Sequence, residues 1–295
     1  MAAFDLDADQ HVLALHAALR DGSYQPGDYV LWVVRDPKVR LVAAAPLVDR
    51  VLQQALVGEL APHYERSFID QQFGCRTGRG PHRAAICFLG AMRRFRYRLC
   101  LDIRRYFPSI HRPTLRALFA RKLRDSRTLG LLDQVLAAGG AVYTRPLAIA
   151  TLGLDAAPLA PDCGMPIGSL LSHFSGALYL DGLDHFLKRQ RKIAGYLRYM
   201  DDFVLFGDDA RQLEAEREAI VEWLAIERGL ELNPKRWHVA DNRQPASYLG
   251  FRIARGGIAP GRKLRRNLHQ RILEAAERGG GALERTLLSY RGMVE

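Results

Sequence analysis

The chain contains the stretch Gly195-Tyr-Leu-Arg-Tyr-Met-Asp-Asp-Phe-Val-Leu-Phe-Gly207, in which two apolar runs flank a pair of acidic residues. Aromatic and aliphatic residues favour strands, so the pattern predicts a β-hairpin with Asp201 and Asp202 at its turn. Side chains alternate along a strand, and only one of two adjacent carboxylates can point squarely at a shared site. A further carboxylate must then come from elsewhere in the chain.

Asp102 is the candidate for that further carboxylate. It ends an apolar run in Arg98-Leu-Cys-Leu-Asp-Ile-Arg-Arg-Tyr-Phe-Pro-Ser-Ile110 and is followed by basic and aromatic residues. Carboxylates combined with substrate phosphates are a usual way to hold Mg²⁺, and two such ions can stabilise both oxygens of a phosphoryl displacement. The pattern therefore favours nucleotidyl transfer. Taken alone, a pair of adjacent Asp residues is more typical of an ordinary turn, as we expect for Asp208-Asp209.

Further segments, in chain order, resemble those of the reverse transcriptases. They are Lys38-Val-Arg-Leu41, Asp49-Arg-Val-Leu-Gln-Gln-Ala-Leu56, Gly74-Cys-Arg-Thr-Gly-Arg79, Leu101-Asp-Ile-Arg-Arg-Tyr-Phe-Pro-Ser-Ile110, Gly164-Met-Pro-Ile-Gly-Ser-Leu-Leu-Ser172, Tyr199-Met-Asp-Asp202, Leu232-Asn-Pro-Lys-Arg236 and Tyr248-Leu-Gly-Phe251. The resemblance implies an α+β fold of the right-hand polymerase type. Its parts would be fingers at residues 1–97, a palm at 98–253 with an antiparallel sheet backed by helices, and a small helical thumb at 254–295.

The resemblance also implies roles for the matching residues. Asp102, Asp201 and Asp202 would hold two Mg²⁺ ions, for which Mn²⁺ could substitute, and the Ile103 backbone carbonyl would add a contact. The incoming nucleotide would lie against Lys38, Arg40, Arg105, Tyr106, Phe107, Ile167 and Gly168. Of these, the Phe107 ring would exclude a 2′-hydroxyl and favour deoxynucleotides. Either Lys235 or Arg236 would face the pyrophosphate. Template and primer would contact Arg76, Arg79, Pro166, Ser169, Tyr199, Met200, Leu249 and Gly250.

The net positive charge of the chain favours a polyanionic partner. The 295-residue chain has 43 Lys and Arg against 32 Asp and Glu, a net charge of +11. Fifteen basic and two acidic residues lie between Arg76 and Arg127, and nine basic and three acidic residues between Arg255 and Arg291. Such basic stretches favour phosphate contacts. The expected partners are an RNA template, a DNA or RNA primer and deoxynucleoside triphosphates.

One position refines the resemblance. Most reverse transcriptases have Gln where this chain has Ile167, and an Ile there resembles the enzymes of diversity-generating retroelements. Those enzymes copy a template RNA with errors at adenines and work with a small helical accessory protein. The pair Ser172-His173 departs from their usual Ser-Gln. The alternatives are a free-standing bacterial reverse transcriptase of phage defence, with or without a template, and a non-catalytic RNA-binding protein of polymerase shape, which the presence of both Asp102 and Asp201 disfavours.

The remaining expectations concern location and secondary structure. The chain lacks an apolar run of eighteen residues and a signal-like start, so we expect a soluble, cytoplasmic protein without a membrane partner. Apolar periodicity predicts helices at residues 7–20, 49–60 and 209–228, and a strand pair is expected within 29–42. The Gly, Ala and Pro content of residues 139–162 predicts a long loop, and residues 262–290 should form two short helices broken by glycines. The resemblance implies a further helix at 172–189.

Overall fold

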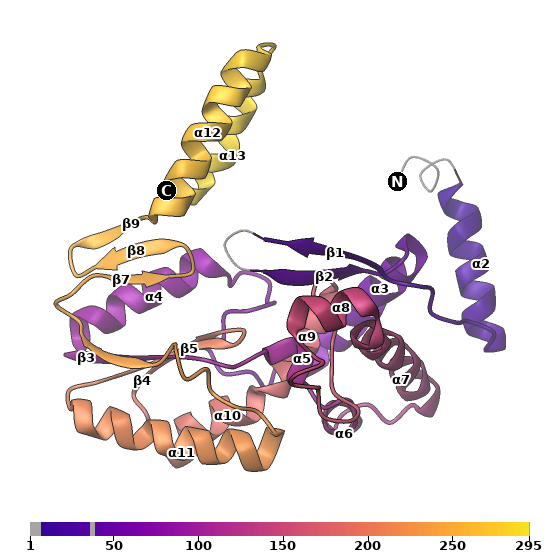
Figure 1. Cartoon of the computed structure of the whole chain (residues 1–295), viewed down its shortest axis with the longest axis horizontal. Coiled ribbons are helices and arrows are strands. Elements are labelled where there is room, and N and C mark those ends of the chain that lie inside the picture. Colours follow the sequence, from indigo (N-terminus) through magenta and orange to yellow (C-terminus); the bar gives the residue numbers. More distant parts are fainter. Residues whose placement is uncertain (1–6, 36–38, 295) are drawn as a thin grey trace. The chain divides into compact units, whose positions relative to one another are not determined.

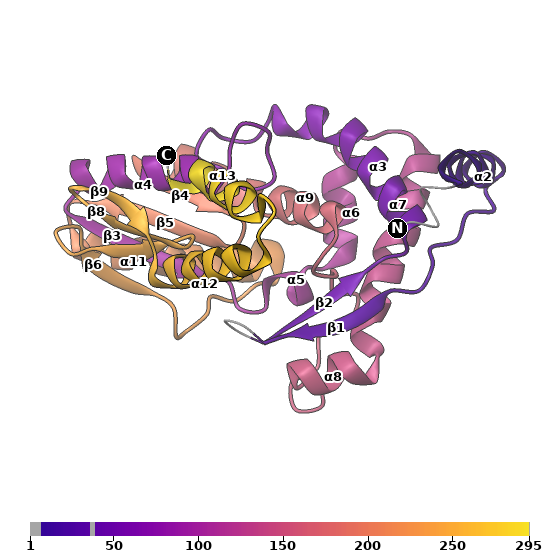
Figure 2. The same cartoon turned by 90° about the horizontal axis from the view of Figure 1, so that it is seen from above.

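The computed structural model describes residues 7–35 and 39–294, and the chain divides into two compact units (Figures 1 and 2). Unit 1 comprises Met1–Ile69, Ile103–His185 and Ile220–Leu232, and unit 2 comprises Asp70–Asp102, Phe186–Ala219 and Asn233–Glu295. Each unit therefore combines segments that are far apart in the sequence. The boundaries proposed for fingers, palm and thumb stay a prediction.

Unit 2 contains a four-stranded antiparallel sheet in the order β4-β5-β3-β6. Its strands are β3 (Tyr97–Asp102), β4 (Gly195–Tyr199), β5 (Asp202–Gly207) and β6 (His238–Asp241). Leu99 and Leu101 are at most 2% exposed, as are Phe203 and Leu205 on the adjacent β5. Because these apolar residues alternate with Cys100 and Asp102, the acidic residue lies on the opposite face of the sheet from the leucines.

A hydrophobic cluster joins this sheet to a helix and a smaller sheet of the same unit. The elements are α4 (Pro81–Arg94), β7 (Ala246–Tyr248), β8 (Phe251–Ala254) and β9 (Gly257–Pro260), and α4 lies along β8 and β9 (Figure 1). Phe88 of α4 stacks on Tyr248 at a centroid distance of 4.8 Å and meets Phe206 edge to face at 5.1 Å. Such aromatic pairs stabilise beyond their buried area, so they fix β7 over the sheet.

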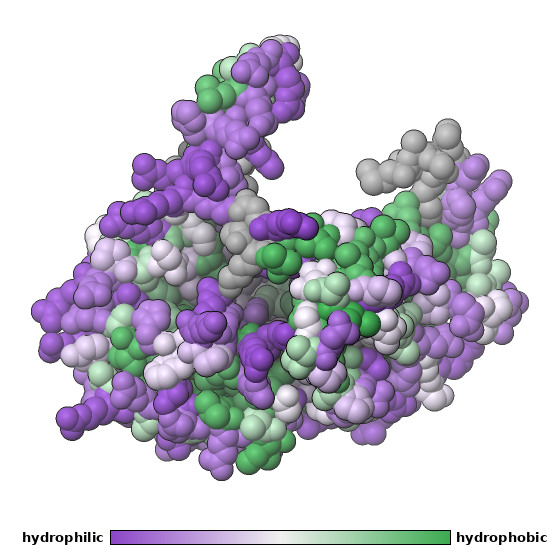
Figure 3. All heavy atoms as spheres, viewed as in Figure 1, coloured by the Kyte–Doolittle hydropathy of each residue, from purple (hydrophilic) through white to green (hydrophobic). Residues whose placement is uncertain are grey.

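Three further helices confirm predictions made from the sequence, at residues 209–228 and within 262–290. The helix α11 (Ala210–Arg228) follows Asp209, whose Oδ1 accepts the Arg211 N–H at 2.8 Å, and ends before Gly229, which has φ of 63°. The helices α12 (Arg262–Arg278) and α13 (Ala282–Val294) run side by side (Figures 1 and 2). Three glycines with positive φ join them, as the sequence predicts. Mostly hydrophilic side chains cover this helix pair in Figure 3.

Unit 1 is mainly helical. Its elements are α2 (Ala8–Asp21), β1 (Val30–Val34), β2 (Arg40–Ala44), α3 (Leu47–Glu65), α5 (Tyr106–Ser109), α6 (Arg112–Ala120), α7 (Ser126–Ala141), a 3₁₀ turn at Val142–Thr144, α8 (Pro146–Leu152), α9 (Leu170–Tyr179) and α10 (Asp181–His185). The rings of Tyr64, Phe119 and Phe174 contact one another edge-on or tilted and join α3, α6 and α9. The predicted strand pair and the helices at 7–20 and 49–60 are confirmed.

The predicted loop at residues 139–162 is wrong in its first half. The structure continues α7 to Ala141 and adds a 3₁₀ turn and α8, so irregular chain begins only at Gly153. Gly139 serves packing rather than a turn, because a Cβ there would lie 2.7 Å from Cδ of Pro166. The prediction took the glycines for turn formers, whereas the helix uses them for close approach.

The predicted helix at 172–189 is interrupted. It consists of α9, α10 and a π-helical turn at Phe186–Gln190. The guanidinium of Arg228 donates through Nε to the Tyr179 carbonyl at 2.7 Å, so this carbonyl at the end of α9 has a side-chain donor. Gly182 leaves room for that guanidinium, since a Cβ there would lie 2.6 Å from Nη2. The Arg228 side chain thus contacts the chain on both sides of the break between α9 and α10.

Candidate active site

Three acidic residues lie at one end of the unit 2 sheet. Asp102, the last residue of β3, lies directly opposite Asp202, the first residue of β5. Tyr199 of β4 also pairs with Asp202, so the two-residue turn Met200-Asp201 joins β4 to β5. The predicted hairpin with an acidic turn is confirmed. Asp102 is 9% exposed, and the other two carboxylates are half-buried.

The negative charge of Asp201 is disfavoured in this cluster. The pKa of Asp201 is raised to about 7, chiefly by removal of the carboxyl from water and then by the nearby charges of Asp202 and Asp102. The guanidinium of Arg236 acts in the opposite direction. A cation bound here would stabilise the ionised carboxylates.

The donor set of this cluster fits Mg²⁺ better than a metal that needs a closed protein cage. Within residues 7–35 and 39–294, His, Cys, Asp and Glu side chains form no group of three or more arranged to hold a metal ion. Mg²⁺ keeps several waters and is usually bound through one or two carboxylates plus substrate phosphates. Asp102, Asp201 and Asp202 supply carboxylate oxygens, the donor type that Mg²⁺ takes. Ile103, the fourth predicted ligand, follows Asp102 and pairs with Leu232 through an isolated antiparallel bridge.

Two residues of the segment after α11 hold Asp102. Asn233 donates its backbone N–H to the Asp102 backbone carbonyl at 2.8 Å and its Nδ2 to the carboxylate Oδ2 at 2.9 Å. Arg236 Nη1 lies 3.3 Å from the same Oδ2. Lys235 is exposed, and its backbone N–H donates to Asn233 Oδ1 at 3.2 Å. Of the two cations that the sequence left open, Arg236 is the one paired with a carboxylate.

A buried arginine supports the hairpin turn. Arg198 is fully buried, and its Nη1 donates to the Met200 carbonyl at 3.0 Å. Met200 has φ of 58°, which is unusual for a residue with a side chain. Gly74 backs the turn, because a Cβ there would lie 2.7 Å from Met200 Sδ. Residue roles for Arg198 and Gly74 were missed by the sequence reasoning, although both stand inside quoted segments.

The segment around Gly74 is itself held in place by the residues predicted to bind nucleic acid. Arg76 Nη1 donates to the Gln72 carbonyl at 3.2 Å, and Arg79 forms an ion pair with Asp70 at 2.8 Å. The Arg79 guanidinium also lies over the Phe73 ring at 5.8 Å. Both arginines therefore have local partners in this structure.

A second buried arginine organises the approach to β7. Arg98 is 4% exposed and donates through Nη1 to the carbonyls of Asp241 and Gln244, each at 3.1 Å. Burial lowers the pKa of this guanidinium. The chain then reverses at Leu249 and Gly250, which both have positive φ. The predicted primer-contact residues thus form the tight turn between β7 and β8.

A pocket of about 420 Å³ in unit 2 adjoins the carboxylates. The Tyr248 hydroxyl is buried and has no hydrogen-bond partner among the residues that the structure describes. The polar residues of the lining carry both signs of charge and include Asp102, Asp202, Lys235, Arg236, His238 and Tyr248.

The predicted nucleotide loop, residues 164–169, lies in unit 1. The Ile167 carbonyl accepts the Ala43 N–H of β2 at 2.9 Å. Gly168 has φ of 121°, and a Cβ there would lie 2.9 Å from the Ala43 carbonyl, so the loop approaches β2 as only glycine allows. Ser169 caps α9 by accepting the Ser172 N–H at 3.3 Å and donates its hydroxyl to Gln53. Pro166 packs against α7.

The segment after Asp102 contacts the same loop. Arg105 has φ of 47°, and its guanidinium donates to the Leu152 carbonyl at 2.7 Å. The Phe107 carbonyl accepts the Met165 N–H at 2.9 Å. Tyr106 begins the short helix α5. In unit 1 the structure thus brings this segment together with the nucleotide loop. Arg40 is exposed on β2, and Lys38 lies outside the described residues.

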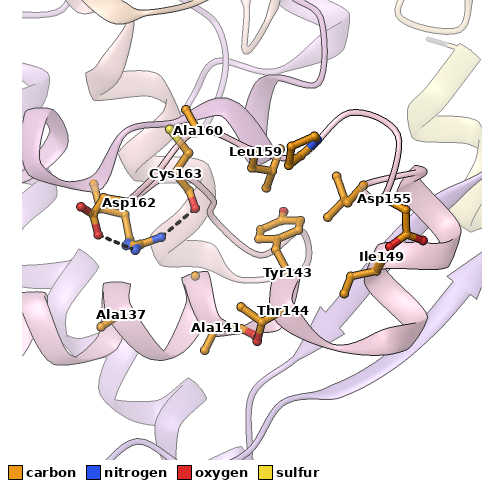
Figure 4. A pocket seen from close by; sticks show the side chains of 14 residues that line it. Ala137, Ala141, Tyr143, Thr144, Ile149, Asp155, Leu159, Ala160, Asp162 and Cys163 are labelled. Carbon is orange, nitrogen blue, oxygen red and sulfur yellow. Dashed lines mark hydrogen bonds and ion pairs between the residues drawn. The ribbon is translucent and has the colours of Figure 1, made fainter.

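A pocket of about 450 Å³ flanks the nucleotide loop in unit 1 (Figure 4). Arg112 is one of the residues that line this pocket. Its Nη1 donates to the Cys163 carbonyl at 2.7 Å and its Nη2 to Asp162 Oδ1 at 3.2 Å. Tyr143 donates its hydroxyl to the Met165 carbonyl at 2.6 Å. These bonds anchor the chain on both sides of the point where it enters the nucleotide loop.

A sequence model of a protein family, described as reverse transcriptase (RNA-dependent DNA polymerase), matches residues 35–253. The chain belongs to the reverse transcriptase family. It is similar to Protein YkfC of Escherichia coli strain K12, with 25% identity over 282 residues that cover 82% of this chain and 70% of that protein.

A solved structure of telomerase from Candida albicans, in complex with a TWJ fragment of telomeric RNA, is similar with a TM-score of 0.53 and 11% identity. The match covers 88% of this reverse transcriptase chain and 52% of the telomerase chain, so this chain spans about half the length of that one. At this identity the likeness shows the fold alone. The predicted right-hand α+β polymerase fold is confirmed.

The family assignment confirms the predicted enzyme class at the level of the family, whose members are RNA-directed DNA polymerases and hence nucleotidyltransferases. Among the described helices, none is long and apolar enough by itself to cross a membrane. The bent pair Ser126–Thr144 and Pro146–Leu152 reaches that length and hydropathy only when taken together.

Proposed function

We propose that this reverse transcriptase synthesises DNA on an RNA template with Mg²⁺ bound at Asp102, Asp201 and Asp202, and that Mn²⁺ can substitute. The observation that carries the proposal is the register of the unit 2 sheet, which sets Asp102 opposite Asp202 beside the turn at Asp201. Three carboxylates lie at one sheet end, and the pKa of Asp201 is raised first by removal from water and then by its acidic neighbours, so the cluster would gain from divalent cations.

In this proposal the chain's own residues orient the reaction. Two bound metal ions would activate the primer hydroxyl and neutralise charge on the phosphates. Asn233 and Arg236 hold the Asp102 carboxylate, and Arg236 would meet the departing pyrophosphate. As the family resemblance implies, the backbone N–H groups of Arg105 and Tyr106 would receive the triphosphate, and the Phe107 ring would exclude a 2′-hydroxyl. Each role extends the family's chemistry to a residue of this chain.

Nucleic acid would be held by basic elements. On α12 the exposed residues Arg262, Arg266 and His269 follow the helical spacing of one face. A primer–template duplex on this face would contact its phosphates. A small helical accessory protein and a cytoplasmic location complete the proposal.

The first test is primer extension with the purified chain, an RNA template, a DNA primer, the four deoxynucleoside triphosphates and Mg²⁺. We expect a product whose sequence is complementary to the template, and EDTA should abolish it. A product that does not depend on template sequence would point to template-independent synthesis. The absence of any extension with either Mg²⁺ or Mn²⁺ would contradict the proposal.

We further propose error-prone synthesis of the diversity-generating type. The support is Ile167, an aliphatic residue next to Gly168 in the loop tied to β2. An aliphatic side chain removes a polar constraint on the nucleotide, and about 1.4 kcal/mol of lost discrimination raises the error frequency roughly tenfold. The test is to sequence cDNA made by the parent and by Ile167→Gln. Ordinary fidelity of the parent at template adenines, or equal error rates in both proteins, would refute this refinement.

A further inference from the structure

The backbone around Phe107 is fixed more firmly than its ring. Its carbonyl accepts the Met165 N–H at 2.9 Å, and the preceding Tyr106 is buried and donates its hydroxyl to the Gly176 carbonyl at 2.5 Å. These bonds hold the short helix α5. They leave the orientation of the half-buried Phe107 ring to its side-chain neighbours.

One of those neighbours comes from a different element. His173 of α9 meets the Phe107 ring edge to face, with centroids 5.6 Å apart and an interplanar angle of 75°. Tyr106 lies on the ring at 5.3 Å in a tilted arrangement. Edge-to-face geometry is the favoured arrangement of such pairs. The Phe107 ring is therefore held by Tyr106 from its own helix and by His173 from α9.

His173 is well placed to act as a fixed support. It stands in the first turn of α9, where its N–H donates to the Ser169 carbonyl at 3.2 Å and Ser169 caps the helix. Partial burial lowers the pKa of the imidazole, which favours the neutral ring against Phe107. Since Ser169 also ends the nucleotide loop, the support and the loop share one anchor.

We propose that His173 is a positioning residue for sugar selection: it fixes the orientation of the Phe107 ring and thereby sets the preference for deoxynucleotides over ribonucleotides. The inference rests on the proposed polymerase function. The Phe107 ring would exclude a 2′-hydroxyl by direct contact, so its discrimination depends on how firmly its orientation is held. A ring that could rotate away would make room for the hydroxyl. His173 limits that swing without touching the nucleotide.

The test compares His173→Ala with His173→Phe, which keeps an aromatic edge against Phe107. For each protein, kcat and KM are measured for deoxynucleotides and ribonucleotides on one RNA template. We expect His173→Ala to lower the deoxy-to-ribo ratio of kcat/KM by about 2- to 12-fold, the worth of one aromatic pair. The change should lie mainly in a lower KM for ribonucleotides. His173→Phe should keep the parental ratio, and His173→Leu replaces His173→Ala if the latter does not fold.

A double variant separates positioning from other roles. In the Phe107→Ala background, His173→Ala should change the ratio no further, because the ring that it supports is gone. The inference would be overturned if His173→Ala alone left the deoxy-to-ribo ratio of kcat/KM unchanged. It would also be overturned if His173→Ala lowered that ratio equally in the Phe107 and the Phe107→Ala backgrounds. Failure of the parent to incorporate any nucleotide would instead refute the proposed function, so the two failures are distinguishable.

Discussion

Arg236 forms an ion pair with Asp102, with Nη1 3.3 Å from Oδ2. The pair links the segment after α11 to the carboxylate at the end of β3, and Asn233 adds a hydrogen bond to the same oxygen. Arg236 is 46% exposed, so the guanidinium can exchange this partner for a phosphate. The neighbouring Lys235 has no such link to a carboxylate among the described residues.

This difference predicts unequal effects of two adjacent substitutions. Arg236→Ala should lower kcat/KM for deoxynucleotides by about tenfold or more, since a hydrogen bond to a charged group contributes about 1.5–3 kcal/mol. Lys235→Ala is the matched control and should stay within about twofold of the parent. Steady-state kinetics on one primer–template measures both. Equal losses in the two variants would show that the ion pair with Asp102 does not distinguish them.

The raised pKa of Asp201 predicts that the stability of the metal-free protein depends on pH. The pKa of Asp201 in the folded protein, about 7, exceeds the ordinary value of 3.8, so the folded protein retains a proton that the unfolded chain releases between these two pH values. The contribution of Asp201 to the free energy of unfolding is therefore fully present below pH 3.8 and is lost as the pH rises through about 7. In EDTA, Asp201→Asn should therefore have a higher Tm than the parent at pH 8.

The Tm difference should shrink as the pH is lowered to 5, and Mg²⁺ at pH 8 should raise the Tm of the parent more than that of Asp201→Asn. Thermal unfolding followed by circular dichroism provides the measurement. A Tm difference that is the same at both pH values would mean that repulsion among the carboxylates is not its source.

Arg198 should be required for the turn that carries Asp201. Arg198→Leu leaves the Met200 carbonyl without its charged donor, which should cost about 1.5–3 kcal/mol of unfolding free energy and lower activity. Arg189→Leu, at an exposed position, is the control. Denaturant unfolding and primer extension are measured on both. Normal extension by a folded Arg198→Leu protein would show that the turn keeps its shape unaided.

Gly74 gives a finer probe of the same turn. Gly74→Ala places a Cβ 2.7 Å from Met200 Sδ and 3.0 Å from its backbone N, so the turn must shift. We expect a loss of extension rate of about tenfold, whereas Gly90→Ala on α4, where a Cβ meets nothing within 4 Å, should be neutral or slightly stabilising. Comparable extension rates in the two variants would argue against contact between this glycine and the turn that carries Asp201.

Local patterns in the sequence were sufficient to predict the strands and the turn that carry the carboxylates. Short runs of aliphatic and aromatic residues mark β3, β4 and β5, and the acidic pair marks the turn, because strand and turn preferences are properties of a few adjacent residues. The glycines of α7 and the break after Tyr179 were misread. Their conformations depend on Pro166 and Arg228, which are distant in sequence and contact them only in the fold.

The same limit applies to the candidate site. Asp102, Asp201 and Asp202 could be found from their flanking residues, but the choice of Arg236 over Lys235 required side-chain positions. Arg98 and Arg198 are basic residues in strands, and a sequence does not show that their charges are buried against backbone carbonyls. Such partners are set by tertiary contacts alone.

The most direct test of the account is the single-turnover rate at which Asp201→Asn extends a DNA primer on an RNA template with saturating Mg²⁺. Asp9→Asn, at an exposed position on α2, is the matched control. We predict a loss of at least about a thousandfold for Asp201→Asn, since stabilisation by the metal ions amounts to several kcal/mol, and parental rates for Asp9→Asn. An Asp201→Asn rate within a few-fold of the parent would contradict the assignment of the carboxylate cluster as the active site.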